Sequence, residues 1–545
     1  MCPRLLPQSE VRDSKESLAA DLFVHPSMEA AMDRLARLSL VRSLVVACAF
    51  LLVVSAAQAQ ITNVTDDTST PIEGAGHDYI HMLSETVNPA NGSVSLRIQV
   101  PTPKGRGITI PFSFSYDSNS VHHLIPFSVY GKAIWTSNIG YLSQGGWNYS
   151  VPMASVSETD QTAGTYPNFY TCVVTTNYMF SDGSGGQHAL GLGTQFSTAG
   201  NCNNAPVSPG GDAQVKASIP ATVQNPSLYT PTVFTGDGTV YRFTSLNESF
   251  ATTPEHYGLV SSIEDRNGNI ITGTDNGGGS FVFKDTAGRT LISSNGFGPS
   301  GATNTVSSSG LTYQVTWKTV SANFSTSTPI WTGPANEPSQ YDNCTPPPTT
   351  ANDSQTVVSN IKLPNLKSYT FYYGTDVTLH GAETNPYGLL SEIDYPSGGW
   401  VTYTWKLSDT PNELADYPGW YNASAATCST DPGAVCPAPV TDGCLYLYSG
   451  PVVASRSVFF GESSSPSLTQ QFTYSTTWAG APSAFWTQKN TSVTSMDGVS
   501  GKSSLTAYSY SPVPAPGSAY SYSGFELIPV ESATSVAFQQ LCRII

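Results

Sequence analysis

Charged residues are scarce in this 545-residue chain, where Asp, Glu, Lys and Arg together make up 11% of the sequence. Basic residues are fewer still, with 23 Lys and Arg against 39 Asp and Glu, for a net charge of −16. Binding to nucleic acid or to an anionic membrane needs concentrated positive charge, so the composition argues against both partners. Long helices are also disfavoured, because their exposed faces use Ala, Leu, Glu and Lys.

Long apolar runs are few, and the clearest lies near the N-terminus, from Leu44 to Val54. It has about half of the ~20 residues that a membrane-spanning helix needs. Basic residues precede the run and Ala57-Gln58-Ala59 follows it as a small-x-small cleavage site, the pattern of a secretory signal peptide. Residues 1–59 are therefore interpreted as a leader, and the remainder as exported, either secreted or at the cell surface.

The start of translation is predicted to be Met28 or Met32, because Met1–Pro26 would make the leader unusually long for a signal peptide. Lipid attachment at Cys48 is an alternative to simple cleavage, although the apolar run continues beyond that cysteine. No later segment is apolar enough to span a membrane, so we expect no transmembrane segment in the mature chain.

Motifs that carry chemistry are missing or incomplete. There is no Gly-x-Ser-x-Gly nucleophile elbow. His77 and His81 have metal-ligand spacing only if they lie on a helix, which the flanking glycines and strand signals disfavour. Acids such as Glu392 and Asp394 could form a hydrolytic carboxylate pair, but acids beside turns more often bond backbone N–H groups. The sequence therefore predicts no enzyme and no catalytic, cofactor-binding or metal-ligating residues.

Seven cysteines remain once the leader is set aside, and export would permit disulfides. No Cys-x-x-Cys pair or neighbouring histidine indicates a metal site. The candidates for disulfide bonds, with connectivity left open, are Cys172, Cys202, Cys428, Cys436 and Cys444.

Strand patterns are abundant. Val94, Leu96, Ile98 and Val100 alternate with polar residues, as expected of a strand with one buried face. A total of 28 Tyr, 22 Phe and 9 Trp provides enough aromatic surface for a core, so the chain is expected to fold. The prediction is an all-β protein.

One phrase occurs twice, at Tyr257–Ile263 and Tyr387–Ile393, each followed by an acidic residue, a turn and a second strand. Asn-Gly and Gly-Gly in these turns predict two-residue hairpins, which require positive φ. A recurring hairpin is typical of repeat-built β structure. The predicted structural turn residues are Gly238, Asn267, Gly268, Asn269, Gly288, Arg289, Gly398 and Gly399.

Aromatic residues have two interpretations. Some are predicted to stabilise the packing of neighbouring hairpins through contacts across strands: Tyr241, Phe243, Tyr403 and Trp405. Alternatively, exposed aromatic rings could stack on sugars; the candidates are Trp400, Trp405, Trp420 and Tyr421.

The expected organisation follows from these patterns and from two insertions rich in turn-forming residues. After the leader at 1–59 it comprises a β-rich N-terminal region at 60–226, hairpins at 227–325, a Pro/Thr/Asn-rich insertion at 326–355, hairpins at 356–406, a Cys-containing insertion at 407–442, hairpins at 443–522 and a terminal tail at 523–545.

Three stretches resemble the repeat cores of YD/RHS proteins: Asp265–Asn269, Asp285–Arg289 and Tyr395–Gly399. The segment from Val87 to Ser118 is similar to the start of bacterial members of that family. The resemblance implies a long curled sheet of antiparallel hairpins, part of a hollow shell that encloses a C-terminal effector. No core motif or effector is recognisable after Tyr522, so the resemblance implies the shell's N-terminal part and no toxin activity.

The leading interpretation is an exported, non-enzymatic scaffold or fragment of an encapsulating shell. Its partner would be an effector or a downstream core segment of the same gene. A cell-surface adhesin or glycan-binding β-protein is the alternative, with carbohydrate or a cell surface as partner. A secreted glycoside hydrolase is the third class, and it would need two carboxylates across a cleft.

Overall fold

A computed structural model describes the chain at residues 80–82, 84–103, 107–126, 133–136, 140–165, 168–183, 186–192, 194–196, 215–218, 230–246, 248–249, 255–327, 330–331, 348–417, 444–460, 464–479, 485–514 and 527–539. All of them belong to one unit of the chain, Pro71–Ile545.

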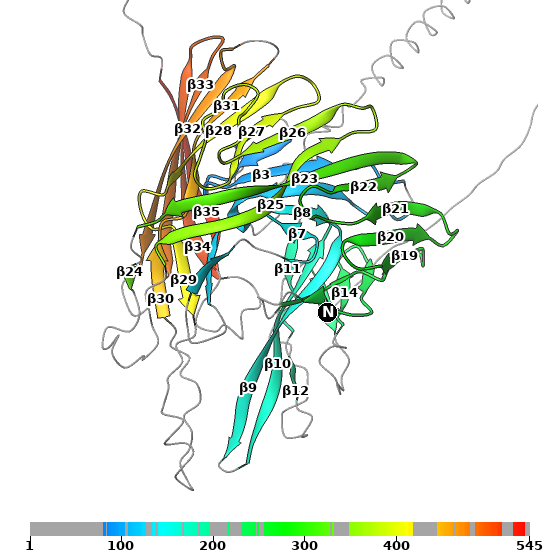
Figure 1. Cartoon of the computed structure of the whole chain (residues 1–545). Coiled ribbons are helices and arrows are strands. Elements are labelled where there is room, and N and C mark those ends of the chain that lie inside the picture. The colour runs from blue at the N-terminus through cyan, green and yellow to red at the C-terminus, as the bar shows by residue number, and fades with distance from the viewer. Residues whose placement is uncertain are drawn as a thin grey trace, which may run out of the picture. The chain divides into compact units, whose positions relative to one another are not determined.

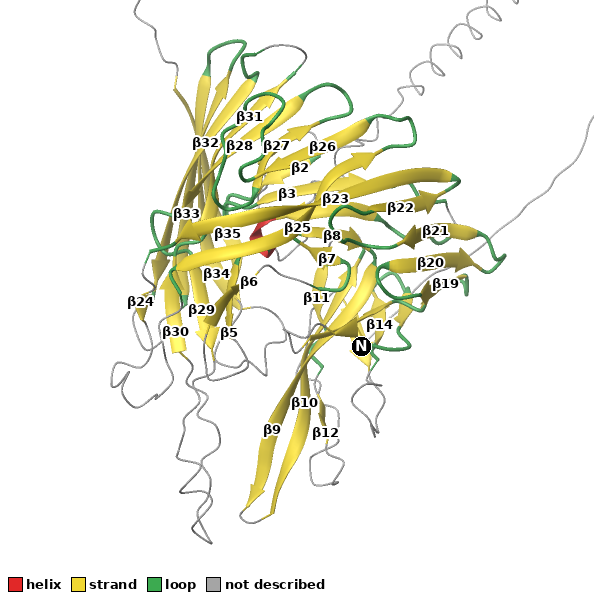
Figure 2. Ribbon diagram, in the orientation of Figure 1, coloured by secondary structure: helices red, strands yellow, loops and turns green. Residues whose placement is uncertain are grey.

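The prediction of an all-β protein is confirmed, because the described residues are almost entirely antiparallel strands and connecting turns (Figure 2). Their one helical element is the 3₁₀ turn η2 (Ser118–Ser120), which Asp117 caps by accepting from Asn119 N. Within these residues no helix combines the length and the apolar character that a membrane crossing requires.

The largest sheet has 18 strands, and neighbours in the sheet are mostly neighbours in the chain (Figure 1). Its pairs are antiparallel, and its two end strands do not pair with each other. In spatial order the strands are β13 (Val215–Ser218), β14 (Thr232–Thr235), β15 (Val240–Arg242), β18 (Ser262–Glu264), β19 (Ile270–Asp275), β20 (Ser280–Asp285), β21 (Thr290–Asn295), β22 (Thr303–Ser308), β23 (Leu311–Ser325), β25 (Thr350–Lys362), β26 (Ser368–Tyr373), β27 (Leu390–Asp394), β28 (Trp400–Leu407), β31 (Pro451–Phe459), β32 (Leu468–Trp478), β33 (Trp486–Asp497), β34 (Ser503–Pro514) and β35 (Leu527–Gln539).

The remaining strands form smaller sheets. A six-stranded N-terminal sheet has the order β1 (Ile80–Met82), β2 (Glu85–Val87), β3 (Val94–Gln99), β4 (Ser113–Asp117), β8 (Trp147–Ser150) and β7 (Ser143–Gln144). A second has β11 (Gln187–Ala189), β10 (Asn168–Asp182), β9 (Pro152–Thr165), β17 (Glu255–Leu259) and β16 (Glu248–Ser249), with β12 (Thr194–Phe196) beside β10. The last two are β5 (His123–Pro126) with β6 (Ala133–Thr136), and β24 (Ile330–Trp331), β30 (Cys444–Tyr448) and β29 (Glu413–Tyr417).

The core lies between the N-terminal sheet and the 18-stranded sheet. Val94, Leu96 and Ile98 of β3 are buried, whereas the residues between them are more exposed, so the predicted alternation holds. Aromatic rings connect the two sheets: Trp147 of β8 lies 4.8 Å from Phe371 of β26, between ring centroids. Buried aromatic pairs add about 0.5–1.5 kcal/mol beyond their area, so such contacts fix how the sheets pack.

A buried ion pair also joins these two sheets. Glu85 of β2 and Arg456 of β31 are both 0% exposed, and the guanidinium donates to Glu85 Oε1 and to Gln470 Oε1. Burial raises the pKa of Glu85 to about 7, although the charge of Arg456 opposes this shift. Such a pair costs desolvation energy and specifies which strands meet.

Within the described residues, five hairpins of the large sheet share one turn, at 235–239, 265–269, 285–289, 363–367 and 395–399. In each, the first residue bonds through its N–H to the fifth residue's carbonyl, and the fourth N–H bonds to the first carbonyl. The fourth residue has positive φ: Gly238, Gly268, Gly288, Leu366 and Gly398.

This geometry corrects the prediction of two-residue turns. Three residues separate the paired ends, as in a type I turn followed by one residue in the left-handed region. Positive φ is therefore required at Gly268 and Gly398 and not at Asn267 or Gly399. In two of the five turns an Asp at the first position holds the loop further: Asp265 Oδ1 accepts from the backbone N–H groups of Asn267 and Asn269, and Asp285 makes the equivalent bonds.

Three segments expected to be insertions or tail contain strands of these sheets. β25 begins at Thr350, within the predicted insertion at 326–355. β29 lies within the predicted insertion at 407–442, and β35 lies within the predicted tail at 523–545.

Candidate functional site

The candidate site lies on the second face of the 18-stranded sheet, at β26, β27 and β28. One cross-strand row, made of Phe371, Ile393 and Val401, is fully buried in the core. Side chains alternate between the faces of a sheet, so the two adjacent rows point to the other face. Those rows are Tyr372, Glu392 and Thr402, and Thr370, Asp394 and Trp400.

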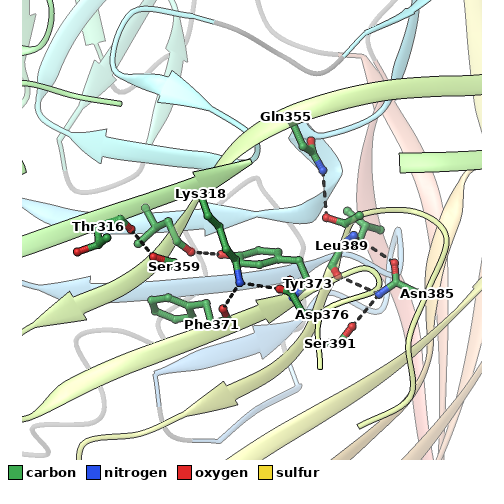
Figure 3. Close-up of polar contacts among 12 residues, drawn as sticks. Thr316, Lys318, Gln355, Ser359, Phe371, Tyr373, Asp376, Asn385, Leu389 and Ser391 are labelled. Carbon is green, nitrogen blue, oxygen red and sulfur yellow. Dashed lines mark hydrogen bonds and ion pairs between the residues drawn. The ribbon is translucent and has the colours of Figure 1, made fainter. Parts of the chain in front are cut away.

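The loop at 374–389, between β26 and β27, brings His380 to this face. Asn385 fixes the end of the loop, because its Nδ2 donates to Leu389 O and Ser391 Oγ, both at 2.9 Å (Figure 3). Asn385 Oδ1 also accepts from two backbone N–H groups of the loop. Gln355 Nε2 donates to Gly388 O at 3.0 Å. These bonds give a long loop a defined path.

Asp376 and Lys318 hold the start of the same loop. Asp376 Oδ2 accepts from Tyr373 N and from Lys318 Nζ, each at 2.6 Å (Figure 3). Lys318 Nζ also donates to Phe371 O and lies over the rings of Tyr372 and Tyr373. The Lys318 ammonium is therefore paired with the Asp376 carboxylate.

His380, Glu392 and Asp394 form the centre of the site. His380 Nδ1 lies 3.1 Å from Glu392 Oε1 and 3.2 Å from Asp394 Oδ1. The backbone N–H of His380 also donates to Glu392 Oε1 at 3.2 Å. The imidazole stacks on the Trp400 ring, with centroids 3.8 Å apart and planes 6° apart, which fixes its orientation.

Two carboxylates placed this closely have perturbed electrostatics. Burial and, after it, the neighbouring charge of Glu392 raise the pKa of Asp394 to about 6, against the opposing effects of His380 and the Tyr372 hydroxyl. Burial and the charge of Asp394 raise the pKa of the Tyr372 hydroxyl to about 12. Glu392 is fully buried, and its Oε2 has no hydrogen-bond partner among the described residues.

Chemically, this cluster offers one imidazole nitrogen and two carboxylate oxygens within 4.8 Å of one another. Among the described residues it is the one group of at least three His, Cys, Asp or Glu side chains that could share a metal ion. Sequence reasoning considered Glu392 and Asp394 only as a hydrolytic pair and did not identify His380, Tyr372 or Lys318.

The predicted turn residues lie at hairpin ends, and none of them contributes a side chain to this cluster. Gly238, Gly268, Gly288 and Gly398 have positive φ. A Cβ at Gly399 would meet Phe459 O at 2.9 Å, so this glycine permits a close approach of β31.

The other predicted turn residues bond the turn aspartates. Asn267 and Asn269 donate to Asp265, and Arg289 donates to Asp285 through its backbone N–H and its Nε.

Within the described residues, no two of the cysteines predicted to form disulfides lie on paired strands. Cys172 lies in β10 opposite Gln161, and Cys444 lies in β30 opposite Tyr417, and nothing is described of either side chain. Cys202, Cys428 and Cys436 lie outside the described residues.

The aromatic residues considered as sugar platforms are used in packing where they are described. Trp400 is 7% exposed and stacks on both His380 and Phe459. Trp405 is half-buried, and its Nε1 donates to Leu390 O at 2.8 Å. Trp420 and Tyr421 lie outside the described residues.

No protein-family model and no curated protein matches this chain. Among solved structures it is similar to the Tc holotoxin pore of Photorhabdus luminescens, at 11% identity and a TM-score of 0.21, over 88% of this chain and 25% of that one. It is also similar to a TcdB2–TccC3 structure, at 9% identity and a TM-score of 0.15, over 81% of this chain and 16% of that one. The chain thus spans about a quarter or less of their lengths, and likenesses at TM-scores this low carry no argument about it.

Proposed function

We propose that this chain is an exported YD/RHS-type scaffold, a part of an encapsulating shell that acts by steric enclosure and has no catalytic site of its own. The observation that supports the proposal is the recurrence of one hairpin turn along a single 18-stranded sheet. Each hairpin buries its apolar row against neighbouring elements, which is how repeat proteins extend a core along one direction.

The chemistry of the turns agrees with such a role. Asp265 and Asp285 make the same set of bonds: Oδ1 accepts two backbone N–H groups, and Oδ2 accepts a donor from the fifth residue's side chain. The donor is Asn269 in one turn and Arg289 in the other. The short pattern Asp-x-x-Gly therefore gives the same turn conformation in both hairpins, although the sequences of the flanking strands differ.

Export is the first part of the proposal to test. Expression from the native leader should give a protein outside the cytoplasm whose N-terminal residue is Gln60, as read by N-terminal sequencing. A variant with Ala57 and Ala59 both replaced by Asp, which removes the small residues of the cleavage site, should stay unprocessed. Retention of the uncut native chain in the cytoplasm would contradict export.

Enclosure is the second part. The genomic DNA for roughly 6 kilobases beyond the Ile545 codon should encode further hairpins with the same Asp-x-x-Gly turns, because a closed shell needs more repeats. A product extended to include them should protect its C-terminal segment from added protease. Replacing Gly268 and Gly398 by Val should abolish this protection, and replacing Gly236, which is also open to solvent but has no positive φ, should preserve it. An unrelated gene directly downstream would overturn the shell.

A further inference from the structure

We propose that His380, Glu392 and Asp394 bind a first-row divalent transition-metal ion, with Zn²⁺ as the best fit. The site would connect the loop at 374–389 to strand β27. It is independent of the scaffold proposal, because a metal ion could bind here whether or not the sheet belongs to a shell.

The distances between the donor atoms suit a shared ion. Ligand atoms about 2.0–2.2 Å from a metal lie roughly 2.8–3.1 Å apart in octahedral geometry and roughly 3.3–3.6 Å apart in tetrahedral geometry. His380 Nδ1 is 3.1 Å from Glu392 Oε1 and 3.2 Å from Asp394 Oδ1. For the imidazole to bind through Nδ1, its proton must lie on Nε2.

Glu392 supplies an independent observation. It is 0% exposed, and its Oε2 finds no hydrogen-bond donor among the described residues. Burying a carboxylate without full compensation is unfavourable, so such groups are normally paired or bound to a metal. Lys318 lies over the ring of Tyr372, the strand partner of Glu392. Its ammonium is already bound to Asp376 and to Phe371 O.

The repeated phrase provides an internal comparison. In its first copy, Ser262 and Glu264 stand where the second copy has Glu392 and Asp394. Arg242 lies opposite Ser262 on the neighbouring strand, and its Nη1 donates to Glu264 Oε2 at 2.7 Å. The first copy therefore has one acid and one cation at these places.

The second copy has two acids and no arginine at the equivalent positions. Tyr372 lies opposite Glu392, at the register place that Arg242 holds in the first copy. One carboxylate has been added and the arginine is replaced by a neutral phenol. His380 then enters from a loop, stacked on Trp400. A divalent cation would restore the missing positive charge, and the donor set of one imidazole and two carboxylates favours Zn²⁺ or Mn²⁺ over Ca²⁺ and Mg²⁺, which prefer oxygen donors alone.

The test uses the untagged chain after treatment with EDTA and dialysis, titrated with Zn²⁺ by calorimetry. One ion per chain should bind, and the thermal midpoint should rise and saturate with the same dependence on Zn²⁺. Co²⁺ should give visible absorption bands typical of nitrogen and oxygen ligands. His380→Gln and Asp394→Asn should each weaken Zn²⁺ binding by more than about 10-fold and remove those bands.

The control variants replace the same residue types elsewhere. Asp409→Asn changes an exposed carboxylate and His256→Gln a histidine on β17, and both should leave binding unchanged. Tyr372→Arg copies the charge of the first repeat, so it should fold and yet bind Zn²⁺ more than about 10-fold more weakly.

Two results would overturn the proposal. One is a wild-type chain that shows no saturable Zn²⁺ binding, which would mean that a proton on Nδ1 bridges the carboxylates instead. The other is binding that survives unchanged in both His380→Gln and Asp394→Asn, which would place the ion at another site.

Discussion

A reciprocal exchange at the shared turn tests the repeat architecture most directly. Four of the five turns have glycine at the position with positive φ, and the turn at 363–367 has Leu366, with φ of +69° and 75% exposure. Gly268 has φ of +78°, and a Cβ there would meet nothing within 4 Å. The exchange consists of Leu366→Gly on one side and Gly268→Ala on the other.

The expected magnitudes follow from two opposed terms. A side chain in the left-handed region costs about 1–2 kcal/mol, while glycine loses about 0.5–1 kcal/mol more backbone entropy on folding than alanine does. Leu366→Gly should therefore stabilise the protein by about 0.5–1 kcal/mol, since its exposed side chain contributes little packing. Gly268→Ala should destabilise it by a similar amount. Combining alanine at Gly268, Gly288 and Gly398, all open to solvent, should cost about 1.5–3 kcal/mol if the turns act independently.

The free energy of unfolding would be measured by urea denaturation, followed by Trp and Tyr fluorescence at constant m-value. Gly236→Ala is the matched control, because that glycine is equally open but has no positive φ. A triple variant no less stable than this control, or a Leu366→Gly variant less stable than the wild type, would refute the strain argument.

Three further predictions concern buried polar groups. The pKa of Glu85 is raised from 4.5 to about 7, so its contribution to stability is complete below pH 4.5 and is lost as pH rises through 7; Glu85→Gln should remove that slope from urea midpoints measured across this range. Burial lowers the pKa of His122 from 6.5 to about 4, so its contribution is present above pH 6.5 and is lost as pH falls through 4; His122→Gln should flatten that acid limb, and an unchanged limb would contradict the assignment. Asn385→Ala should cost about 2–4 kcal/mol by leaving buried backbone groups unpaired and should speed amide exchange at 374–389, whereas exposed Asn365→Ala should do neither.

The sequence predicts features that depend on short-range patterns. Alternation at Val94, Leu96 and Ile98 specifies a strand and its buried face, and an Asp followed three residues later by Gly specifies a turn. The type of turn was mispredicted because Asn-Gly and Gly-Gly are compatible with two-residue and three-residue loops. At 265–269 the three-residue loop is reinforced by the N–H groups that Asp265 accepts, whereas the turn at 395–399 forms the same loop with Tyr395 at the first position.

Contacts between residues far apart in the sequence could not be predicted from the sequence alone. Glu85 and Arg456 are 371 positions apart, and neither shows by its neighbours that it will be buried. Alternation placed Glu392 and Asp394 on one face of a strand, yet it does not indicate that a loop covers this face. His380 lies in that loop, 12 residues before Glu392 and outside any periodic pattern.

The position of this cluster gives a physical reason to expect function there. At Arg242 and Glu264 the second face of the sheet is open to solvent, and the ion pair is partly exposed, so either charge tolerates the loss of its partner at small cost. At Glu392 the same face is covered, and the acid is fully buried. Folding alone would favour an apolar residue at that place, because a buried acid destabilises the sheet unless something compensates it. The second copy of the repeat has Glu392 where the first has Ser262, and burying a glutamate costs more free energy than burying a serine. The loop above it is held in place by its own hydrogen bonds. This departure from the repeat pattern is therefore better explained by ligand binding than by packing.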